Sequence, residues 1–314
     1  MRSRSSRTSN LKPWQSTIEN QEVALLSRVS PWQEARTAPR PARLLVAVLA
    51  FAAMAGAVPV AQAQNARQEL SAESAIETIK RRGAIKIGLS LFMPWAMRDI
   101  NGDLIGFEID VGRKLAEDMG VEAEFIPTAW DGIIPALISG KFDVIISGLS
   151  ITPQRNLTVN FTRPYAYTGA TIVANRRLTE GFSVEDYNSP EVSFAVRRAT
   201  LAAVVVANSF PDAELLLFDD EGATMQEVLN GTAHATIASE PAPSRYSRTY
   251  PDILHVPFDV LFDEQSEGFA VRKGDPDALN FFNHWIANHW RSGWLQERHD
   301  YWFTTEDWAD LVVQ

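Results

Sequence analysis

The sequence predicts an α/β protein composed of two lobes. From residue 71 onward, stretches with helical periodicity alternate with short apolar runs typical of strands, and the connections between them are short. Such alternation indicates helices packed on a largely parallel sheet. The same order of elements begins again after Asn188, which indicates a second lobe of the same class.

The helices and strands of the first lobe are marked by periodicity and by their end residues. Apolar residues recur every four positions from Phe107 to Met119, and Gly120 follows directly, so this stretch predicts an amphipathic helix with a glycine stop. The apolar run Asp143–Ile146 is typical of a buried parallel strand. The other elements expected here are helices over 71–82 and 131–139, strands over 84–88 and 121–126, and a hairpin turn at Asn101-Gly102.

The second lobe and the C-terminal region continue this pattern. Strands are expected over 192–196, 215–218 and 233–238, with helices over 201–208 and 221–229 between them. Asp275-Pro276 then opens a further helix, because proline suits the first helical position. Its shared apolar face consists of Leu279, Phe282, Trp285, Ile286 and His289.

The charge of the chain changes near residue 63. Residues 1–63 contain eight Lys and Arg side chains against three Glu, whereas the whole chain has a net charge of −10. The remaining 251 residues therefore carry −15. A charge of this sign and size repels phosphate groups, which argues against nucleic acid and anionic membrane surfaces as partners.

Residues 1–63 are expected to form a signal peptide region. An apolar run covers 44–56, and Ala61-Gln-Ala63 is a small-x-small site that predicts cleavage after Ala63. A transmembrane anchor is the alternative, but the run falls short of the roughly 20 residues that a spanning helix needs. The basic region before it is about twice the ordinary length, for which an over-extended start is the simplest explanation. The sequence has no cysteine, which is compatible with an oxidising compartment.

The densest local chemistry follows the strand expected at 143–146. Ser147 and Ser150 come directly after it, and Thr152-Pro153 predicts a helix N-cap with proline at the first helical position. Ligands of α/β sheets bind beyond the carboxyl ends of strands, so both serines and Arg155 are candidates for contacting an anion. Arginine suits a carboxylate because its planar fork donates two parallel hydrogen bonds. Simple capping with a solvated Arg155 is the alternative that spacing alone leaves open.

Several further motifs occur in a fixed order and spacing along the chain. They are Gly106-Phe-Glu-Ile-Asp110, Trp130-Asp-Gly-Ile-Ile-Pro-Ala-Leu137, Ser139-Gly-Lys-Phe-Asp143, Ile151-Thr-Pro-Gln-Arg155, Phe161-Thr-Arg-Pro-Tyr165, Glu267–Pro276 and Gly293-Trp294. With these motifs the chain resembles the family 3 extracellular solute-binding proteins, the polar-amino-acid receptors of ABC importers. The resemblance covers roughly residues 76–303.

The resemblance implies a two-lobed periplasmic-binding-protein-like fold of type II, with two crossover strands and the ligand enclosed between the lobes. By analogy the crossovers lie near Thr171–Asn175 and Gly268–Arg272. The first lobe would comprise residues 64–171 and a return segment over 268–314 with C-terminal helices, and residues 172–267 would form the second lobe. A periplasmic monomer that delivers its solute to the permease of an ABC transporter is therefore expected.

The resemblance also implies ligand contacts residue by residue. Arg155 would bind the ligand carboxylate, assisted by Ser150 and by main-chain groups around Ser147–Ser150. Thr200 would add a hydroxyl at the start of a second-lobe helix, where the helix N-terminus itself favours an anion. Phe92 and Trp130 would pack on the ligand as an aromatic wall.

Two positions depart from the family pattern. Where the family usually has an aspartate for the ligand's amino group, this chain has Ser239, with Glu240 next to it as a candidate substitute. At a turn, the side chain of Glu240 can still point inward although it is one residue further along the chain. In a regular strand it would point to the opposite face from Ser239. Arg198 lies just before Ala199-Thr200, where a glycine is common. It either adds positive charge beside the pocket, as a dicarboxylate ligand would require, or forms a surface salt bridge.

Other functions have less support in the sequence. The five histidines lack metal-ligand spacing, and neither a dinucleotide fingerprint nor a P-loop occurs, so no metal or cofactor is expected. An enzyme is the rival hypothesis, because the same fold resembles exported cyclohexadienyl and arogenate-type dehydratases, with Glu240 as the candidate general acid. A soluble module that presents its ligand to a sensor is the third hypothesis.

Overall fold

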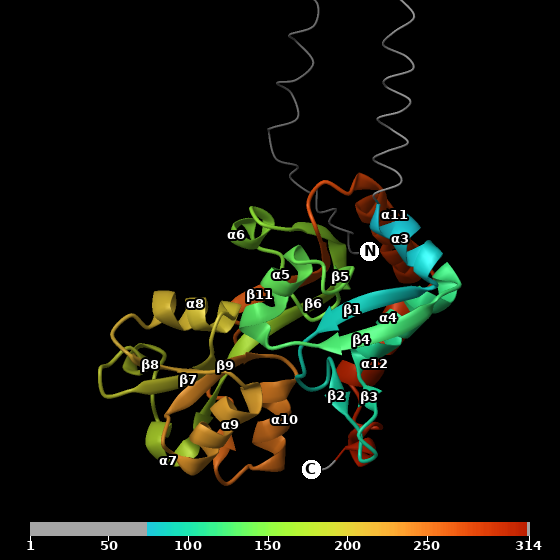
Figure 1. The fold of residues 1–314 in the computed structure, drawn as a ribbon. Coiled ribbons are helices and arrows are strands. Elements are labelled where there is room, and N and C mark those ends of the chain that lie inside the picture. Colours follow the sequence, from blue (N-terminus) through green and yellow to red (C-terminus); the bar gives the residue numbers. More distant parts are fainter. Residues whose placement is uncertain (1–73, 313–314) are drawn as a thin grey trace, which may run out of the picture. The chain divides into compact units, whose positions relative to one another are not determined.

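The computed structural model describes residues 74–312, which form the helices and strands of both lobes (Figure 1). The expected signal region 1–63, its cleavage site at Ala63 and residues 64–73 of the expected first lobe lie outside the described residues. Within residues 74–312, no helix has both the length and the apolar character needed to cross a membrane.

A nine-stranded mixed sheet runs through both lobes, in the order β4-β1-β5-β11-β6-β9-β7-β8, with β10 paired to β6 off this path. The pairs of β1 with β4 and β5, and of β7 with β8 and β9, are parallel. β6 and β11 run antiparallel to each other and to β9 and β5. The strands are β1 (Ala84–Leu89), β4 (Glu122–Pro127), β5 (Val144–Ile145), β6 (Asn160–Asn175), β7 (Ser193–Arg197), β8 (Glu214–Phe218), β9 (Ala235–Ser239), β10 (Leu254–His255) and β11 (Asp263–Val271).

Strands β6 and β11 carry the chain between the lobes. β6 is 16 residues long, and its buried side chains pass from the first-lobe core at Ala166 to the second-lobe core at Ala170. This passage precedes the Thr171–Asn175 range that the family resemblance implies. The reason is that Thr171–Ala174 already pair with β9 inside the second lobe.

The return passage in β11 shows the same offset. Phe269 and Val271 already pack in the first-lobe core, so the part of β11 that joins the lobes comes before the expected Gly268–Arg272 range. The pairing with β6 shifts register around Gly268, as at a β-bulge, and bulges bend the strand that contains them. A Cβ added to Gly268 would lie 3.0 Å from the Ile151 side chain, which favours glycine at this bend.

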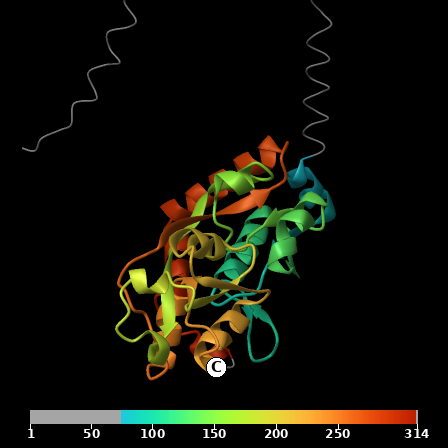
Figure 2. The ribbon, with the colours of Figure 1, turned by 90° about the vertical axis from the view of Figure 1, so that its left-hand side faces the viewer.

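Helices α3, α4, α11 and α12 of the first lobe pack around one apolar core, and η1 and α5 pack around a second one. The two ends of the lobe are joined at the first core. The Ser74 hydroxyl donates to Asp275 Oδ1 at 3.0 Å, while Asp275 Oδ1 accepts from the N–H of Ala278 at 2.9 Å. Helices α3 and α11 accordingly lie side by side at one end of the lobe (Figures 1 and 2). The helical elements are α3 (Ala75–Arg82), α4 (Phe107–Met119), η1 (Trp130–Gly132), α5 (Ile133–Ile138), α6 (Pro153–Asn156), α11 (Pro276–Arg291), α12 (Trp294–Phe303) and η3 (Ala309–Leu311).

The expected hairpin and the expected long helix of this lobe are both confirmed. Asn101-Gly102 lies between β2 (Met97–Arg98) and β3 (Leu104–Ile105), which pair antiparallel. Helix α4 spans Phe107–Met119 and ends at Gly120, whose positive φ of 67° is the left-handed conformation that glycine adopts most easily.

The second lobe has its own core, which includes Ile172, Tyr187 and Phe194. Side-chain caps begin two of its helices: Thr200 Oγ1 accepts from the N–H of Ala203 at 3.3 Å to begin α8, and Asp220 Oδ1 accepts at 3.1 Å from the N–H of Ala223 to begin α9. Both helices therefore start just beyond the carboxyl ends of β7 and β8. The helical elements are α7 (Arg176–Thr179), η2 (Glu185–Tyr187), α8 (Leu201–Ser209), α9 (Glu221–Asn230) and α10 (Ala242–Thr249).

Leu137 and Ile138 are neighbours in α5, and substituting each of them tests which side of this helix packs against the first lobe. Leu137 is 0% exposed, whereas Ile138 is 52% exposed. We expect Leu137→Ala to lower the free energy of unfolding by about 2–5 kcal/mol, because it leaves a cavity in the core. Ile138→Ala should lower it by less than about 0.5 kcal/mol. Urea titrations followed by circular dichroism measure both, and equal losses in the two variants would contradict the packing of α5.

Candidate ligand-binding site

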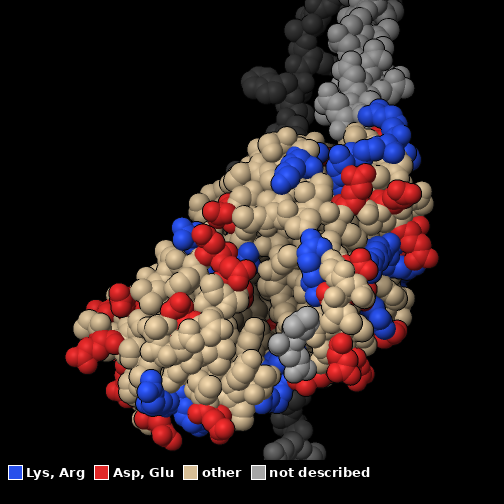
Figure 3. Space-filling model, turned by 60° about the horizontal axis from the view of Figure 1, so that its bottom comes forward, with Lys and Arg blue, Asp and Glu red and all other residues tan. Residues whose placement is uncertain are grey.

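A cavity lies between the lobes, beyond the carboxyl ends of the parallel strands. The space-filling view shows the surface hollowed between the lobes, with neutral residues on most of its visible walls (Figure 3). Five of the nine residues proposed from the sequence line the cavity, namely Phe92, Trp130, Ser150, Thr200 and Ser239. The other four, Ser147, Arg155, Arg198 and Glu240, do not line it.

Phe92 and Trp130 form an aromatic wall on the first-lobe side of the cavity. Their ring centroids lie 6.3 Å apart at an interplanar angle of 76°, an edge-to-face arrangement. Phe92 also stacks on Trp95 at 5.7 Å, and Trp95 is only 2% exposed within the first-lobe core. The core thus supports the wall from behind.

Arg155 lies beside Trp130, with its guanidinium carbon 5.7 Å from the centre of the ring. Its Nη1 donates to the carbonyl oxygen of Ser150 at 3.0 Å, and its Nη2 donates to that of Ala199 in the second lobe at 3.3 Å. No carboxylate within residues 74–312 forms an ion pair with it. Burial lowers the pKa of Arg155, although an arginine stays protonated at neutral pH. Arg155 is therefore a half-buried cation available to an anion.

The carbonyl oxygen of Ala199 joins the two lobes. It accepts from Trp130 Nε1 at 3.0 Å as well as from Arg155. Ala199 has a φ of 58°, a left-handed conformation that is strained for a residue with a Cβ. The backbone of Ala199 is thus held in a conformation that a glycine would adopt more easily. In this conformation its carbonyl oxygen accepts from both Trp130 and Arg155 of the first lobe.

Arg197, which was not among the residues expected in the site from the sequence, lines the cavity and is only 6% exposed. Its Nη2 donates to Ser90 Oγ in the first lobe at 2.6 Å, and its Nε donates to the carbonyl oxygen of Asp219 at 3.2 Å. Its guanidinium carbon lies 5.3 Å from the centre of the Trp130 ring. Trp130 is therefore close to two guanidinium groups, one from each lobe.

Arg198 lies on the outside of the second lobe. Its Nε is 2.5 Å from Asp219 Oδ1, and 45% of its side chain is exposed. The structure therefore gives Arg198 the surface salt bridge that was the alternative to a pocket role. Successive residues at the end of a strand point in opposite directions, which is why Arg197 enters the cavity and Arg198 leaves it.

Thr200 combines a structural role with a position in the cavity. Its hydroxyl donates to the carbonyl oxygen of Arg197 at 2.6 Å while capping α8. The first residues of α8, Leu201 and Ala202, also line the cavity. The N–H groups at a helix start lack partners within the helix and attract anions. This corner of the cavity is thus suited to a carboxylate.

Two serines and a glutamine form a polar floor. Ser150 of the first lobe and Ser239 of the second both donate to Gln265 Oε1, each at 3.2 Å. Gln265 belongs to β11 and was not expected in the site. Ser147 is fully buried, and its Oγ accepts from the N–H of Ser90 at 2.8 Å, so it links two first-lobe loops below the cavity.

The acidic residue in the cavity is Glu221 rather than Glu240. Glu240 accepts from Ser244 Oγ at 2.9 Å and from the Ser244 N–H at 3.4 Å, at the beginning of α10. Glu221 is the first residue of α9 and lines the cavity. Burial raises the pKa of the Glu221 carboxyl, and the nearby Arg197 lowers it in part. The Asp220 cap was the sequence signal that could have placed Glu221 at this edge of the sheet.

A buried hydrogen-bond chain lies directly below the cavity. The N–H of Gly148, which lines the cavity, donates to Tyr165 Oη at 3.0 Å, and Tyr165 Oη donates to Glu108 Oε1 at 2.7 Å. Burial raises the pKa of Glu108 to about 8. In β11, Glu267 accepts from Thr168 Oγ1 at 2.7 Å, and burial raises its pKa to about 7. Both carboxyls are therefore shifted towards the neutral form.

Within the part of the chain that the structure describes, no cluster of His, Asp and Glu side chains is arranged to hold a metal ion. The polar groups of the cavity are instead guanidinium, carboxyl, hydroxyl and amide groups. These groups can hold an organic ion by hydrogen bonds and charge.

Two α/β lobes joined by a pair of long strands, with a polar and aromatic cavity between them, define a type II periplasmic binding protein. The chain belongs to the bacterial extracellular solute-binding proteins, family 3, whose family model matches residues 85–305. The family assignment made from the sequence motifs is thereby confirmed.

Relatives of this chain include both binding proteins and an enzyme. The L-cystine-binding protein TcyJ of Escherichia coli is 28% identical over 74% of this chain and 86% of its own length. Cyclohexadienyl dehydratase of Pseudomonas aeruginosa is 24% identical over 84% of this chain and 96% of its own length. A solved binding component of an ABC transporter from Wolinella succinogenes, complexed with lysine, is 35% identical, with a TM-score of 0.69 over 73% of this chain and 99% of that one.

The raised pKa values of Glu108 and Glu267 predict that stability falls as the pH rises. In the unfolded chain both groups ionise near their ordinary value of 4.5, whereas in the folded protein they keep their protons up to about 8 and about 7. Their contribution to stability is therefore complete below pH 4.5 and is lost as the pH rises through 7 and 8.

Glu108→Gln should make the free energy of unfolding less dependent on pH, because its amide never ionises. One group changes this free energy by at most about 1.4 kcal/mol per pH unit. Urea titrations at several pH values between 5 and 8 measure the slope. Glu117→Gln, on the exposed side of α4, is the control and should leave the slope unchanged. An unaltered slope in Glu108→Gln would show that Glu108 is ionised in the folded protein.

Proposed function

We propose that the protein captures an amino acid, or a close derivative of one, in the periplasm and delivers it to an ABC importer. The observation that carries this proposal is that groups of opposite charge face one cavity. Arg197 and Glu221 line it together, and Arg155 stands beside its aromatic wall without a carboxylate partner within residues 74–312. A zwitterion presents a carboxylate and an ammonium group that match these charges.

The carboxylate of the ligand would bind between Arg155 and the start of α8. Arg155 donates at present to two carbonyl oxygens, which a carboxylate can replace with stronger, charge-assisted hydrogen bonds. Thr200 and the first N–H groups of α8 face the same cavity. Their dipoles favour an anion in the same place as the guanidinium does.

The ammonium group would bind Glu221. Ser239, which replaces the family's usual aspartate, already donates its hydroxyl proton to Gln265 and is a weaker partner for a cation. Glu221 lines the cavity with a carboxyl whose pKa burial has raised. A bound ammonium group would lower this pKa again, since an opposite charge favours the ionised form. The aromatic wall of Phe92 and Trp130 would cover the apolar part of the ligand.

The proposed delivery to a transporter is supported by the family and not by the cavity. We propose that the chain is exported with cleavage near Ala63, that the segments before the β6 crossover and after the β11 crossover act as one lobe and the residues between the crossovers as the other, and that a monomer docks on a permease. Closure of the lobes around the ligand would then be the signal that the transporter reads.

Arg155→Gln and Glu221→Gln should each weaken amino-acid binding by about 10-fold to 100-fold or more, because each leaves one charged end of the ligand without its partner. A thermal-shift panel of amino acids identifies the ligand, and isothermal titration calorimetry measures its affinity. Arg198→Gln is the matched control, since its partner Asp219 lies on the surface, and it should change the affinity less than about 3-fold.

A larger loss in Arg198→Gln than in Arg155→Gln would overturn this assignment of the site. A panel in which no amino acid raises the melting temperature would overturn the proposed ligand class.

A dehydratase is the second candidate, favoured by the relative from Pseudomonas aeruginosa and by a buried carboxyl in the cavity. The geometry does not favour Glu240 as its general acid, because that side chain is held at the start of α10 outside the cavity. We expect no phenylpyruvate or phenylalanine when the purified protein is incubated with prephenate or arogenate. Product formation that persists in Glu240→Gln and is lost in Glu221→Gln would instead favour the enzyme.

A further inference from the structure

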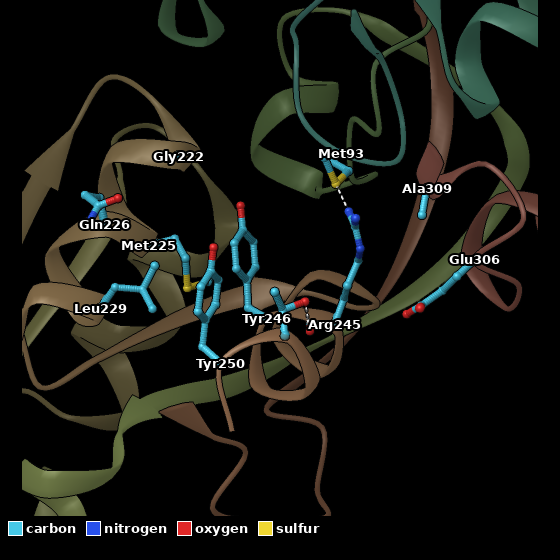
Figure 4. Close-up of a pocket in the computed structure, with 11 residues that line it drawn as sticks. Met93, Gly222, Met225, Gln226, Leu229, Arg245, Tyr246, Tyr250, Glu306 and Ala309 are labelled. Carbon is cyan, nitrogen blue, oxygen red and sulfur yellow. Dashed lines mark hydrogen bonds between the residues drawn. The ribbon is translucent and has the colours of Figure 1, made fainter. Parts of the chain in front are cut away.

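A second cavity of about 420 Å³ lies next to the first. The second lobe contributes residues of α9, of α10 and Tyr250 directly after α10, and the first lobe contributes three residues (Figure 4). The lining residues are Gly222, Met225, Gln226, Leu229, Arg245, Tyr246, Thr249 and Tyr250 from the second lobe and Met93, Glu306 and Ala309 from the first. Because both lobes provide its walls, an occupant would contact both lobes, as a ligand in the first cavity would.

One wall of this second cavity is aromatic. The rings of Tyr246 and Tyr250 lie parallel, with centroids 6.5 Å apart and an interplanar angle of 16°. Both hydroxyl groups point the same way as the Arg245 guanidinium in the close-up, and no hydrogen bond joins them to the other residues drawn (Figure 4). The wall therefore offers apolar ring surface and two hydroxyl donors.

Arg245 places a positive charge in this cavity. Its guanidinium contacts Met93 Sδ and lies 4.7 Å from the centre of the Trp308 ring, and no carboxylate within residues 74–312 forms an ion pair with it. The acid that shares the cavity, Glu306, is paired instead with Arg248 at 2.8 Å. Arg245 thus faces a cavity that holds one acid, Glu306, and that acid is already paired with Arg248, so the Arg245 guanidinium is suited to an anionic ligand group.

The two cavities share a partition. Met93 lines both of them. At the start of α9, Glu221 lines the first cavity and its neighbour Gly222 the second. In α10, Ala242 lines the first, and Arg245, one turn later, the second. A methionine side chain is flexible and adapts its shape easily, so Met93 is the part of this partition that can move aside.

We infer that the binding site extends past Met93 into the second cavity, and that the preferred ligand is an amino acid whose side chain ends in a second carboxylate bound by Arg245. This inference rests on the proposed function, because it takes the α-carboxylate to bind near Arg155 and the ammonium group to bind Glu221. The side chain of the ligand would then run along Gly222 and Met93 to the tyrosines and Arg245.

Pairs of amino acids with equal chain length test the inference on the full-length mature protein. Norleucine and 2-aminoadipate have six carbons each and differ in a terminal methyl or carboxylate group, and 2-aminoheptanoate and 2-aminopimelate form the pair with seven carbons. We expect at least one dicarboxylate to bind about 10-fold to 100-fold more tightly than its neutral partner by isothermal titration calorimetry. Arg245→Gln should remove this advantage and change the affinity for the neutral amino acid less than about 3-fold.

Two further variants separate charge from structure. Arg245→Lys should keep part of the preference for the dicarboxylate, and Glu306→Gln, which removes the acid that shares the cavity with Arg245, should keep or increase it. Equal affinities within both pairs, or a preference that survives Arg245→Gln, would overturn the extension and leave the proposed function standing. Absence of binding by all four compounds and by every standard amino acid would overturn both.

Discussion

The pairing of β6 with β11 is the constraint on which the rest of the structure depends. These two antiparallel strands belong to both lobes at once, so every loop of the cavity is positioned relative to them. Gln265 in β11 shows the effect most directly, since one oxygen atom accepts from Ser150 of the first lobe and from Ser239 of the second. The same strand pair buries the hydrogen bond between Thr168 and Glu267. Any movement of one lobe relative to the other therefore has to bend or twist the β6–β11 strand pair, whose register is irregular near Gly268.

The architecture was predictable because it rests on local patterns. Period-four apolar residues followed by Gly120 gave the bounds of α4, and Asn101-Gly102 gave the hairpin. The position of the crossovers was not accessible in this way, because it depends on which strands pair with β6, a contact between distant parts of the chain. Helix α10 was not expected, because no side-chain cap marks its start.

The chemistry of the site was predictable in type but only partly in position. Hydroxyl, aromatic and guanidinium groups were expected and are present, but Arg197 rather than Arg198 lines the cavity, and Glu221 rather than Glu240. In both cases the chain has two residues of the same type that could face the cavity. The direction of each side chain determines which of the two lines it. That direction is set by the end of β7 for the arginines and by the Asp220 cap for Glu221. For the two arginines, no motif in a single sequence reports this direction.

The Ala199 carbonyl oxygen has a consequence for how affinity arises. It accepts from Arg155 across the gap between the lobes, so the protein itself supplies an oxygen atom where a ligand oxygen would bind. If a ligand carboxylate binds Arg155 as proposed, it would replace one acceptor by another, and the free energy of binding would be the difference between these two hydrogen-bonded states. Affinity in such a protein can be tuned from the backbone of the second lobe, at a strained alanine, without altering any atom that touches the ligand.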